Sequence, residues 1–381
     1  MENKKKESTI HYFDYSLLAI VIFLVCFGLV MLYSTSSYSA QVKFGDSMWY
    51  FKKQLKASII SVVVMLAVAF PHYHYYAKLA KVSYVVAFIL MALVQTDAFG
   101  IEAYGARRWI KVPGFGQMQP AEVMKIAIVL LIPYLICKAG KYLNRTDVFA
   151  KIFFWGLVAA GGVYVLTDNL STAVIVLGMV FTMLFVVHKK TAPFVALAVG
   201  AVAAVYVGAR MLGSILSTSE NFRIRRILVW LNPEAHASEG GFQVMQGLYA
   251  IGSGGFFGKG LGNSAQKMII PEVQNDMILS IICEELGVFG AIIVLVLFGM
   301  LLYRLLFIAQ NAPDAYGALM VTGIFAHIAI QVILNVAVIL NLIPTTGVTL
   351  PFISYGGTSI LFLMVEMGLA LNVSARIRFE E

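Results

Sequence analysis

The sequence predicts an all-α polytopic membrane protein with about ten transmembrane helices. Sixty per cent of its 381 residues are hydrophobic and only 13% are charged, whereas a soluble domain carries roughly 25% charged residues. Apolar runs near the roughly 20 residues that cross a bilayer recur along the whole chain, without the alternation typical of a barrel strand. Backbone in hydrocarbon must satisfy its own hydrogen bonds, so these runs are predicted to be helices. We expect residues 1–381 to form a single integral membrane domain.

Basic residues in the short turns predict the orientation of these helices. Lys4, Lys5 and Lys6 precede the first run, Tyr15–Tyr33; at about 19 residues it exceeds the h-region of a signal peptide and is predicted to be a retained anchor. Lysines and arginines recur after the fourth, sixth and last runs, so both termini are predicted to be cytoplasmic. The later runs cover Ala57–Phe70, Val82–Val94, Gln119–Cys137, 152–166, 170–187, 192–213, 287–308, 316–340 and 358–373.

A region of about 70 residues, Ser214–Leu286, contains no clean spanning run and is predicted to be a large, ordered extracytoplasmic loop. Its polar end carries Glu272, Asp276, Glu284 and Glu285. Asp276 is a candidate catalytic base, but Asn275–Asp276 before an apolar run is also what a helix N-cap looks like. If the helix includes Asp276, that residue shares a face with Ser280 and Glu284.

Several basic residues fall on the predicted outer face, against the usual charge rule, and suggest that something anionic is held there. Guanidinium groups of Arg107 and Arg108 suit phosphate oxygens, although snorkelling to lipid headgroups beside Trp109 is the alternative. The other exceptions are Lys43, Lys52, Lys53, Lys56 and Lys111.

The large loop has basic residues of its own. Arg223, Arg225 and Arg226 are interpreted as part of an amphipathic surface helix. The run Gly252–Gly262, GSGGFFGKGLG, fits no nucleotide-binding motif and predicts flexible or closely packed backbone. Lys259 and Lys267 could still reach a diphosphate from this run.

Glu122 and Lys125 interrupt an otherwise apolar helix. At spacing i, i+3 they can pair, and a charge in the bilayer normally faces a bundle interior or a wet cavity. A substrate pocket and a structural ion pair are equally compatible with this pattern. Elsewhere the sequence offers no metal spacing: Cys26, Cys137 and Cys283 are scattered, and the histidines do not cluster. The net charge of +8 lies largely in inter-helix turns, so no nucleic-acid partner is predicted.

The chain resembles the SEDS (shape, elongation, division and sporulation) family, the FtsW/RodA-like proteins of bacteria. The resemblance covers essentially the whole chain, and the last of its segments is close to a family signature. TLPFISYGG favours the division and sporulation (FtsW/SpoVE-like) branch over the elongation branch. The matching segments are GARRWI, QPAEVMK, QVMQGLYAIGSGGFFGKGLGNSAQK, PEVQND, EELG and IPTTGVTLPFISYGGTS.

The resemblance implies a peptidoglycan glycosyltransferase that polymerises lipid II at the outer face of the cytoplasmic membrane. It assigns the family's essential aspartate to Asp276, the helix-four salt bridge to Glu122 and Lys125, and the loop arginines to Arg107 and Arg108. A frequent family motif, P-D-x-G-T, is replaced by TDNLST, so Asp168 and Asn169 receive no role.

The resemblance also implies partners. These are lipid II, polyprenyl-diphosphate-linked glycan, a class B penicillin-binding transpeptidase, and other division or elongation proteins. No cofactor is required by the residues, although a divalent cation, Mg²⁺ or Mn²⁺, could assist. Two other functions stay open: a lipid II flippase that uses the Glu122–Lys125 pair, and a non-catalytic scaffold for cell-wall enzymes.

Overall fold

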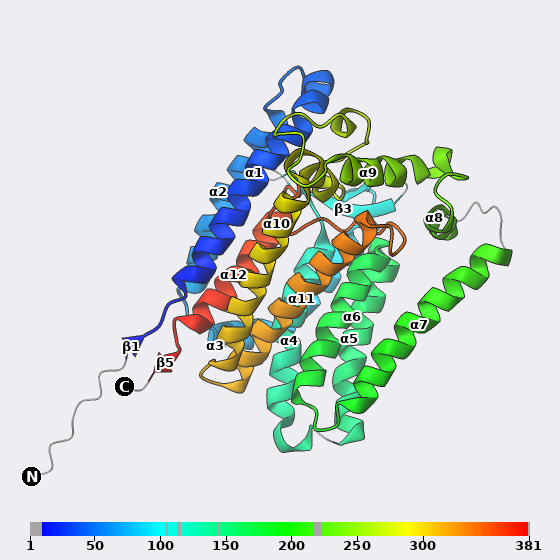
Figure 1. The fold of residues 1–381 in the computed structure, drawn as a ribbon. Coiled ribbons are helices and arrows are strands. Elements are labelled where there is room, and N and C mark those ends of the chain that lie inside the picture. Colours follow the sequence, from blue (N-terminus) through cyan, green and yellow to red (C-terminus); the bar gives the residue numbers. More distant parts are fainter. Residues whose placement is uncertain (1–9, 104–105, 113–115, 144, 216–221, 380–381) are drawn as a thin grey trace, which may run out of the picture.

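A computed structural model describes residues 10–103, 106–112, 116–143, 145–215 and 222–379, and its fold is a helical bundle (Figure 1). Eight helices are long and apolar enough to cross a membrane. Two further helices belong to the same bundle: α2 carries three lysines in its first turns, and α12 is shorter. The predicted polytopic helical architecture is confirmed. The twelve described α-helices are α1 (Tyr15–Phe44), α2 (Trp49–Ala69), α3 (His74–Leu93), α4 (Pro120–Ala139), α5 (Thr146–Thr167), α6 (Leu170–Val187), α7 (Ala192–Ile215), α8 (Phe222–Leu231), α9 (Gly241–Ser253), α10 (Ile278–Gln310), α11 (Ala315–Ile339) and α12 (Ser359–Ser374).

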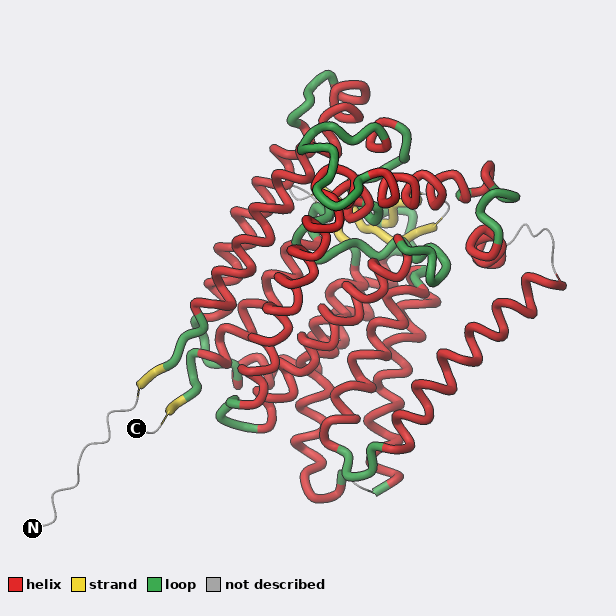
Figure 2. The backbone as a smooth tube through the Cα atoms, in the orientation of Figure 1, coloured by secondary structure: helices red, strands yellow, loops and turns green. Residues whose placement is uncertain are grey.

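The two ends of the bundle differ in structure. At one end lie both chain termini and the α4–α5 and α6–α7 turns (Figure 1). At the other end lie α8, α9, the loops on either side of α9 and the 340–358 loop (Figure 2). A three-stranded antiparallel sheet at this end joins α3 to α4 and was not predicted; its strands are β2 (Gly100–Ala103), β3 (Ala106–Val112) and β4 (Gly116–Met118). At the opposite end, β1 (Ile10–His11) pairs with β5 (Arg378–Phe379).

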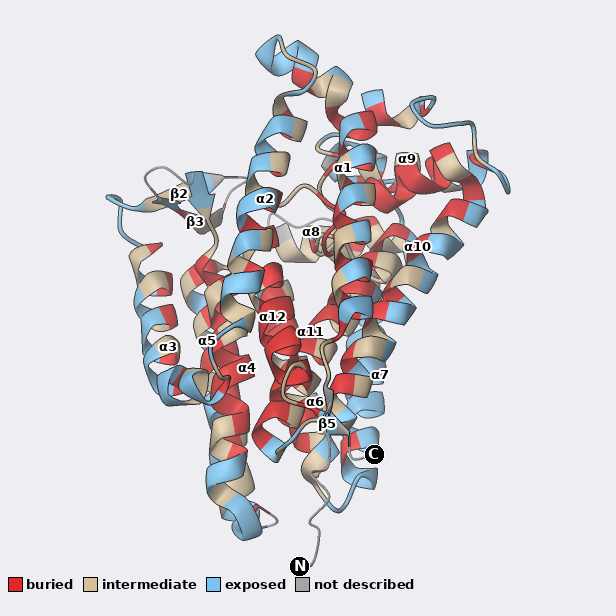
Figure 3. Cartoon of the chain, turned by 90° about the vertical axis from the view of Figure 1, so that its left-hand side faces the viewer, coloured by how far each residue is buried: buried red, intermediate tan, exposed pale blue. Residues whose placement is uncertain are grey.

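Buried residues concentrate in the centre of the bundle, on α4, α11 and α12, while the outer helices present exposed faces (Figure 3). This pattern suits a protein in lipid, where outward apolar side chains meet hydrocarbon rather than water. Local sequence sets several helix starts. Asp14, Asn169 and Asp314 each accept a hydrogen bond from a backbone N–H of the first turn, which satisfies a donor that the helix itself leaves free.

Helix α10 is interrupted at Gly287, where φ is 71° and ψ is −172°. The glycine-rich run packs into the interruption and exchanges backbone hydrogen bonds with both halves of the helix. Backbone amides of Lys259 and Gly260 donate to the carbonyls of Glu284 and Glu285 at 2.9 Å each. The amides of Val288 and Phe289 donate to the carbonyls of Gly255 and Phe256 at 3.0 Å each. The sequence predicted either flexible or closely packed backbone for Gly252–Gly262, and the structure shows close packing.

The N-cap interpretation of Asp276 is wrong. Helix α10 begins at Ile278 with Met277 at the N-cap, and no side chain caps it. Asp276 precedes the helix and does not share a helical face with Ser280 and Glu284. Its carboxylate is therefore not occupied in satisfying a helix terminus.

The Gly287→Ala substitution should lower the stability of the folded protein by about 1–3 kcal/mol, because a non-glycine residue is strained at this φ. A Cβ added there would also lie 2.3 Å from the carbonyl oxygen of Phe256. The apparent midpoint of thermal unfolding in detergent measures the change. Gly299→Ala, in the same helix with nothing within 4 Å of the added Cβ, is the matched control and should be neutral or slightly stabilising. Equal behaviour of the two variants would contradict the account of the broken helix.

Candidate functional site

Three segments far apart in the sequence meet where Asp276 lies. Helix α8 contacts the 340–358 loop through Arg226 Nη1, which donates to the carbonyl of Thr345 at 3.0 Å, and Trp230 Nε1, which donates to that of Asn341 at 3.0 Å. The amide of Tyr355 donates to the carbonyl of Gln274 at 2.9 Å. Helix α8, the 340–358 loop and the 270–277 loop therefore form one structure around the acid.

Asp276 is half-buried and lies close to a cation. Burial is the main cause that raises the pKa of the Asp276 carboxyl above its ordinary value, and the charge of Glu272 adds to it. The charge of Arg226 and a backbone N–H act in the opposite direction. A carboxylate held in this balance binds a proton more readily than a solvated aspartate does, which suits a group that accepts protons.

Glu272 shapes the loop that carries Asp276. It adopts a left-handed backbone conformation with φ of 49°, and its carboxylate accepts from Lys43 Nζ at 2.7 Å and from Gln274 Nε2 at 3.0 Å. Lys43, at the end of α1, is one of the basic residues that break the charge rule. Its charge is therefore paired, at least in part, with a carboxylate of the protein itself and not only with an external anion.

Arginines from three elements form a cluster beside this loop. Arg108 on β3 donates to the backbone carbonyl of Asp168 at 2.9 Å, and the carboxylate of Asp168 forms an ion pair with Arg223 of α8. Burial, followed by the charge of Arg108, lowers the pKa of the Arg226 guanidinium. Burial also lowers that of Arg108, whose Nε is buried with no partner among the described residues. Repulsion among these half-buried cations would be relieved by an anion.

The structure separates the two arginines that the sequence treats together. Arg107 points to the other side of β3 and forms ion pairs with Asp97 at 2.8 Å and Glu102 at 3.7 Å. The lysines of α2 also have partners: Lys52 pairs with Asp46 at 2.8 Å, and Lys53 lies 3.8 Å from the ring centroid of Trp49. The positive charges of these three residues are therefore paired, at least in part, with acidic or aromatic side chains of the protein itself.

Lys259 and Lys267 are held by the two glutamates of α10. Lys259 Nζ lies 2.7 Å from Glu284 Oε1, and Lys267 Nζ lies 3.2 Å from Glu285 Oε1 and 2.6 Å from the carbonyl of Gly262. Both carboxylates are fully buried. Ser34 of α1 also donates to Glu285 at 2.6 Å. The predicted contact of these lysines with a diphosphate stays a prediction, and their described contacts fasten the glycine-rich run to α10.

Glu122 and Lys125 form the predicted pair, with 2.8 Å between Oε1 and Nζ. Both are buried, and Lys125 Nζ also lies 2.8 Å from Nε2 of His327 on α11. Nδ1 of His327 lies 2.6 Å from a carboxylate oxygen of Glu366 on α12. The pair thus belongs to a closed network between α4, α11 and α12. A contact of Glu122 or Lys125 with substrate is not tested by this arrangement and stays a prediction.

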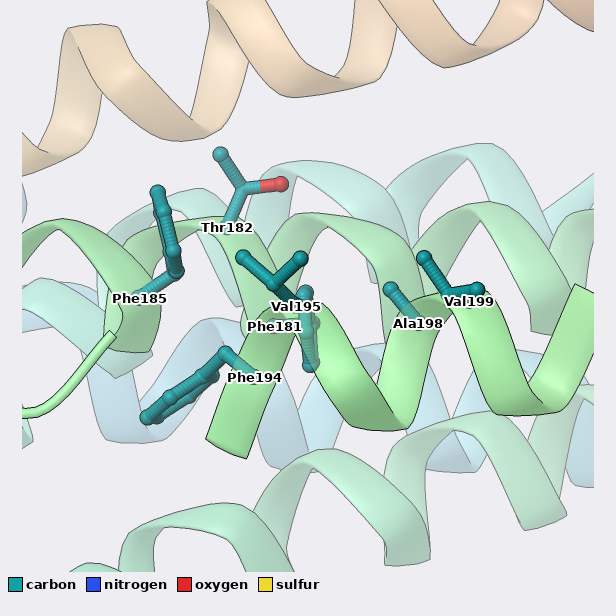
Figure 4. A pocket seen from close by; sticks show the side chains of 7 residues that line it. All are labelled: Phe181, Thr182, Phe185, Phe194, Val195, Ala198 and Val199. Carbon is teal, nitrogen blue, oxygen red and sulfur yellow. The ribbon is translucent and has the colours of Figure 1, made fainter. Parts of the chain in front are cut away.

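An apolar groove between α6 and α7 lies elsewhere. It has a volume of about 210 Å³ and is lined by Phe181, Thr182, Phe185, Phe194, Val195, Ala198 and Val199 (Figure 4). These residues lie near the α6–α7 turn, at the end of the bundle opposite to Asp276 (Figure 1). The groove is therefore not part of the site around the acid. Among the described residues, no group of three or more His, Cys, Asp or Glu side chains could hold a metal ion.

Sequence reasoning missed Arg226, Asp168 and Asn335 as parts of this site. Arg226 lies on the predicted helix, α8, and its guanidinium group also contacts the 340–358 loop, which the sequence pattern does not indicate. Asp168 has a left-handed backbone conformation, with φ of 48°, and links Arg108 to Arg223. Because TDNLST departs from the family motif at this position, the resemblance assigned no role to Asp168. No local pattern marks any of the three, because their contacts are with residues 55 to 119 positions away.

Comparison with known proteins fits this architecture. The model of the FtsW/RodA/SpoVE family, described as "Cell cycle protein", matches residues 15–378. The chain belongs to the FtsW/RodA/SpoVE family. Stage V sporulation protein E of Bacillus subtilis is 37% identical over 374 residues, which cover 96% of this chain and 98% of that protein. A probable peptidoglycan glycosyltransferase FtsW of Geobacter sp. (strain M18) is 33% identical over 370 residues, 96% of this chain and 98% of the relative.

Two solved structures extend the likeness of this FtsW/RodA/SpoVE-family chain to three dimensions. A chain of a peptidoglycan synthase complex that coordinates polymerization and crosslinking matches with a TM-score of 0.76 at 29% identity, and covers 95% of this chain and 97% of that one. The rod shape determining protein RodA of Thermus thermophilus matches with a TM-score of 0.69 at 26% identity, over 95% and 96% of the two chains. The resemblance stated from the sequence motifs is thereby confirmed.

In this family member, Lys267→Met should destabilise the fold by about 3–5 kcal/mol, because it leaves Glu285 buried without its cation. The apparent unfolding midpoint in detergent measures the loss. Adding Glu285→Gln to the same chain should restore part of it by removing the uncompensated charge. Lys259→Met is the milder comparison, since the Lys259 side chain is 37% exposed. A Lys267→Met protein of unchanged stability would contradict the structural role and favour the predicted contact with substrate.

Proposed function

We propose that this chain polymerises a lipid-linked disaccharide, lipid II, into glycan strands, with Asp276 as the general base. The activity class, a peptidoglycan glycosyltransferase, rests on relatives of that name that align with nearly the whole chain. The observation that carries the residue assignment is the position of Asp276: a half-buried acid near Arg226, just before α10, where α8, the 340–358 loop and the 270–277 loop meet at the end of the bundle remote from the termini.

The reaction joins two sugars by direct displacement. The acceptor's 4-hydroxyl loses its proton to Asp276 as its oxygen attacks the anomeric carbon of the donor. The new carbon–oxygen bond forms while the bond to the polyprenyl diphosphate breaks, and that diphosphate leaves with the electron pair. Because an α-linked donor gives a β-linkage, the displacement inverts the anomeric carbon without a covalent enzyme intermediate. A positioned base contributes about 10²–10⁴-fold to such a step.

Arg108 and Arg226 are the cations best placed to offset the charge that grows on the leaving diphosphate. Their half-buried guanidinium groups, whose like charges repel, would gain from a dianionic group nearby. Arg223 and Asp168 hold this arrangement in place. A divalent cation that arrives with the diphosphate is compatible with this scheme and stays a prediction.

The membrane orientation follows from the same scheme. Basic turns at the end that carries the termini support a cytoplasmic position for that end, and we propose on this basis that Asp276 faces the outer side of the bacterial cytoplasmic membrane. The polyprenyl tails stay in hydrocarbon and would reach the site laterally between helices. The solved synthase complex supports a crosslinking partner, which we propose to be a class B penicillin-binding protein.

Asp276→Asn should reduce polymerisation of fluorescent lipid II by the reconstituted protein about 10²–10⁴-fold, because the amide cannot accept the proton. The wild-type rate should rise with pH through the Asp276 pKa, which burial raises, since only the ionised carboxylate acts as a base. The acid limb should therefore lie above the ordinary aspartate pKa of about 3.9. A flippase without polymerase activity predicts that transport survives in Asp276→Asn and that the wild type makes no glycan. A wild-type protein that makes no glycan, or an Asp276→Asn variant that polymerises at the wild-type rate, would refute the enzyme assignment to Asp276.

Arg226→Gln and Arg108→Gln should each lower kcat/KM for lipid II by about 10²-fold, because each removes charge stabilisation at the leaving diphosphate. Arg225→Gln is the matched control: it removes the same charge from the same helix, and Arg225 is not among the groups that act on Asp276. Steady-state kinetics over a range of lipid II concentrations measures the effects. Equal losses in all three variants would point to a general electrostatic effect and would contradict a specific diphosphate site.

A further inference from the structure

A stripe of polar side chains runs along the buried face of α11. His327, Gln331 and Asn335 are spaced four residues apart, so they lie on one face of the helix, and their exposed fractions are 1%, 6% and 0%. Polar groups are expensive to bury in a membrane bundle unless each has a partner. His327 contacts α4 and α12, Gln331 contacts the 340–358 loop, and Asn335 contacts that loop and the backbone of Asp276.

The first two members connect the ion-pair network to the 340–358 loop. His327 contacts Lys125 and Glu366, as described above, and its Nε2 also lies 2.8 Å from Gln331 Oε1. Gln331 Nε2 donates to the backbone carbonyl of Thr349 at 3.0 Å. The buried pair of α4 and the backbone of the loop beside the acid are therefore both in contact with this pair of α11 side chains. Nε2 of His327 carries either a proton or a lone pair, so its tautomer decides whether it accepts from Lys125 or donates to Gln331.

The third member contacts the acid's own backbone. Asn335 Nδ2 donates to the carbonyl of Asp276 at 2.9 Å and to the carbonyl of Val348 at 2.8 Å. Both partners are acceptors, so the orientation of the amide is fixed: its NH₂ group must face them. One side chain thereby ties the 270–277 loop and the 340–358 loop to the same rigid helix.

We infer that Asn335 is a positioning residue for Asp276, and that the polar stripe of α11 joins the Glu122–Lys125 network to the candidate active site. The inference rests on the proposed function. Asp276 lies outside any helix, so its direction depends on what holds its backbone. The 270–277 loop is fastened on one side by Glu272 and Lys43, and Asn335 provides the anchor on the core side. Loss of this anchor would leave the fold intact and displace the carboxylate.

A matched control exists at the other end of the bundle. Asn372 of α12 is also 0% exposed, and its Nδ2 donates to the backbone carbonyl of Val68 at 2.9 Å and to that of Pro71. Asn335→Ala and Asn372→Ala therefore remove the same chemistry, an amide that bonds two carbonyls, from sites near and far from Asp276. Any general cost of losing a buried amide appears in both.

The first measurement is kinetic. Asn335→Ala should lower kcat for lipid II polymerisation about 10–100-fold, as expected for a displaced catalytic group, with a smaller change in KM and a shifted acid limb of the pH–rate profile. Asn335→Asp should be worse, because it places a carboxylate oxygen against two carbonyls. Asn372→Ala should keep its kcat and pH profile at a similar loss of thermal stability. Losses of kcat that are equal in Asn335→Ala and Asn372→Ala would overturn the inference.

The second measurement does not depend on catalysis. Dicyclohexylcarbodiimide modifies protonated carboxyl groups in apolar surroundings, and peptide mass spectrometry gives the rate of labelling at Asp276. This rate should change at least about threefold in Asn335→Ala, in line with a displaced group, and should stay at the wild-type value in Asn372→Ala. An unchanged rate in Asn335→Ala would overturn the inference even if Asp276 is the base. If Asp276→Asn remains active, the base assignment fails, and the labelling rate still decides whether Asn335 positions this carboxyl.

Discussion

The structure depends on one constraint: non-helical backbone at the end of a membrane bundle must find hydrogen-bond partners within the protein. Where this backbone is buried, unpaired carbonyl and amide groups are costly. The glycine-rich run supplies such partners at the break in α10, where four backbone hydrogen bonds join the two segments. Side-chain donors supply them in the 340–358 loop, where Arg226, Trp230, Gln331 and Asn335 all bond backbone carbonyls. The site around Asp276 is built from these same contacts.

This constraint explains which basic residues are available to an anionic substrate. The cations with carboxylate partners fasten loops: Lys43 to Glu272, Lys259 to Glu284 and Lys267 to Glu285. Arg108 and Arg226 donate to backbone carbonyls of Asp168 and Thr345. These bonds hold two guanidinium groups in fixed positions near the acid. Fixed positions of this kind are what binding a diphosphate requires.

The sequence predicted the bundle well, because apolar runs of spanning length can be recognised locally. It also indicated Asp276 and Arg108 as candidate site residues, which stay predictions, and it predicted the Glu122–Lys125 pair, which the structure confirms. It placed the helix boundaries less well: the α10 helix starts at Ile278, nine residues before the predicted 287, because the polar EELG segment is helical. Buried Glu284 and Glu285 are compatible with helix there only because the glycine-rich run and two lysines meet them. That pairing spans 18 to 25 residues and leaves no periodic signal.

Long-range contacts also explain why the residues around Asp276 could not be ranked from the sequence. Arg223, Arg225 and Arg226 look equivalent on an amphipathic helix, and only the docking of α8 on the 340–358 loop distinguishes Arg226. Asn335 looks like an isolated polar residue in an apolar run. Its importance comes from facing two loops that are 13 and 59 residues away in the chain. A catalytic aspartate on a loop needs such an anchor, because the direction of its carboxylate is set by its own backbone and no helix fixes it. The rigid element that supplies the anchor, α11, is also the one that carries His327 into the core, so the acid and the buried ion pair share a single support.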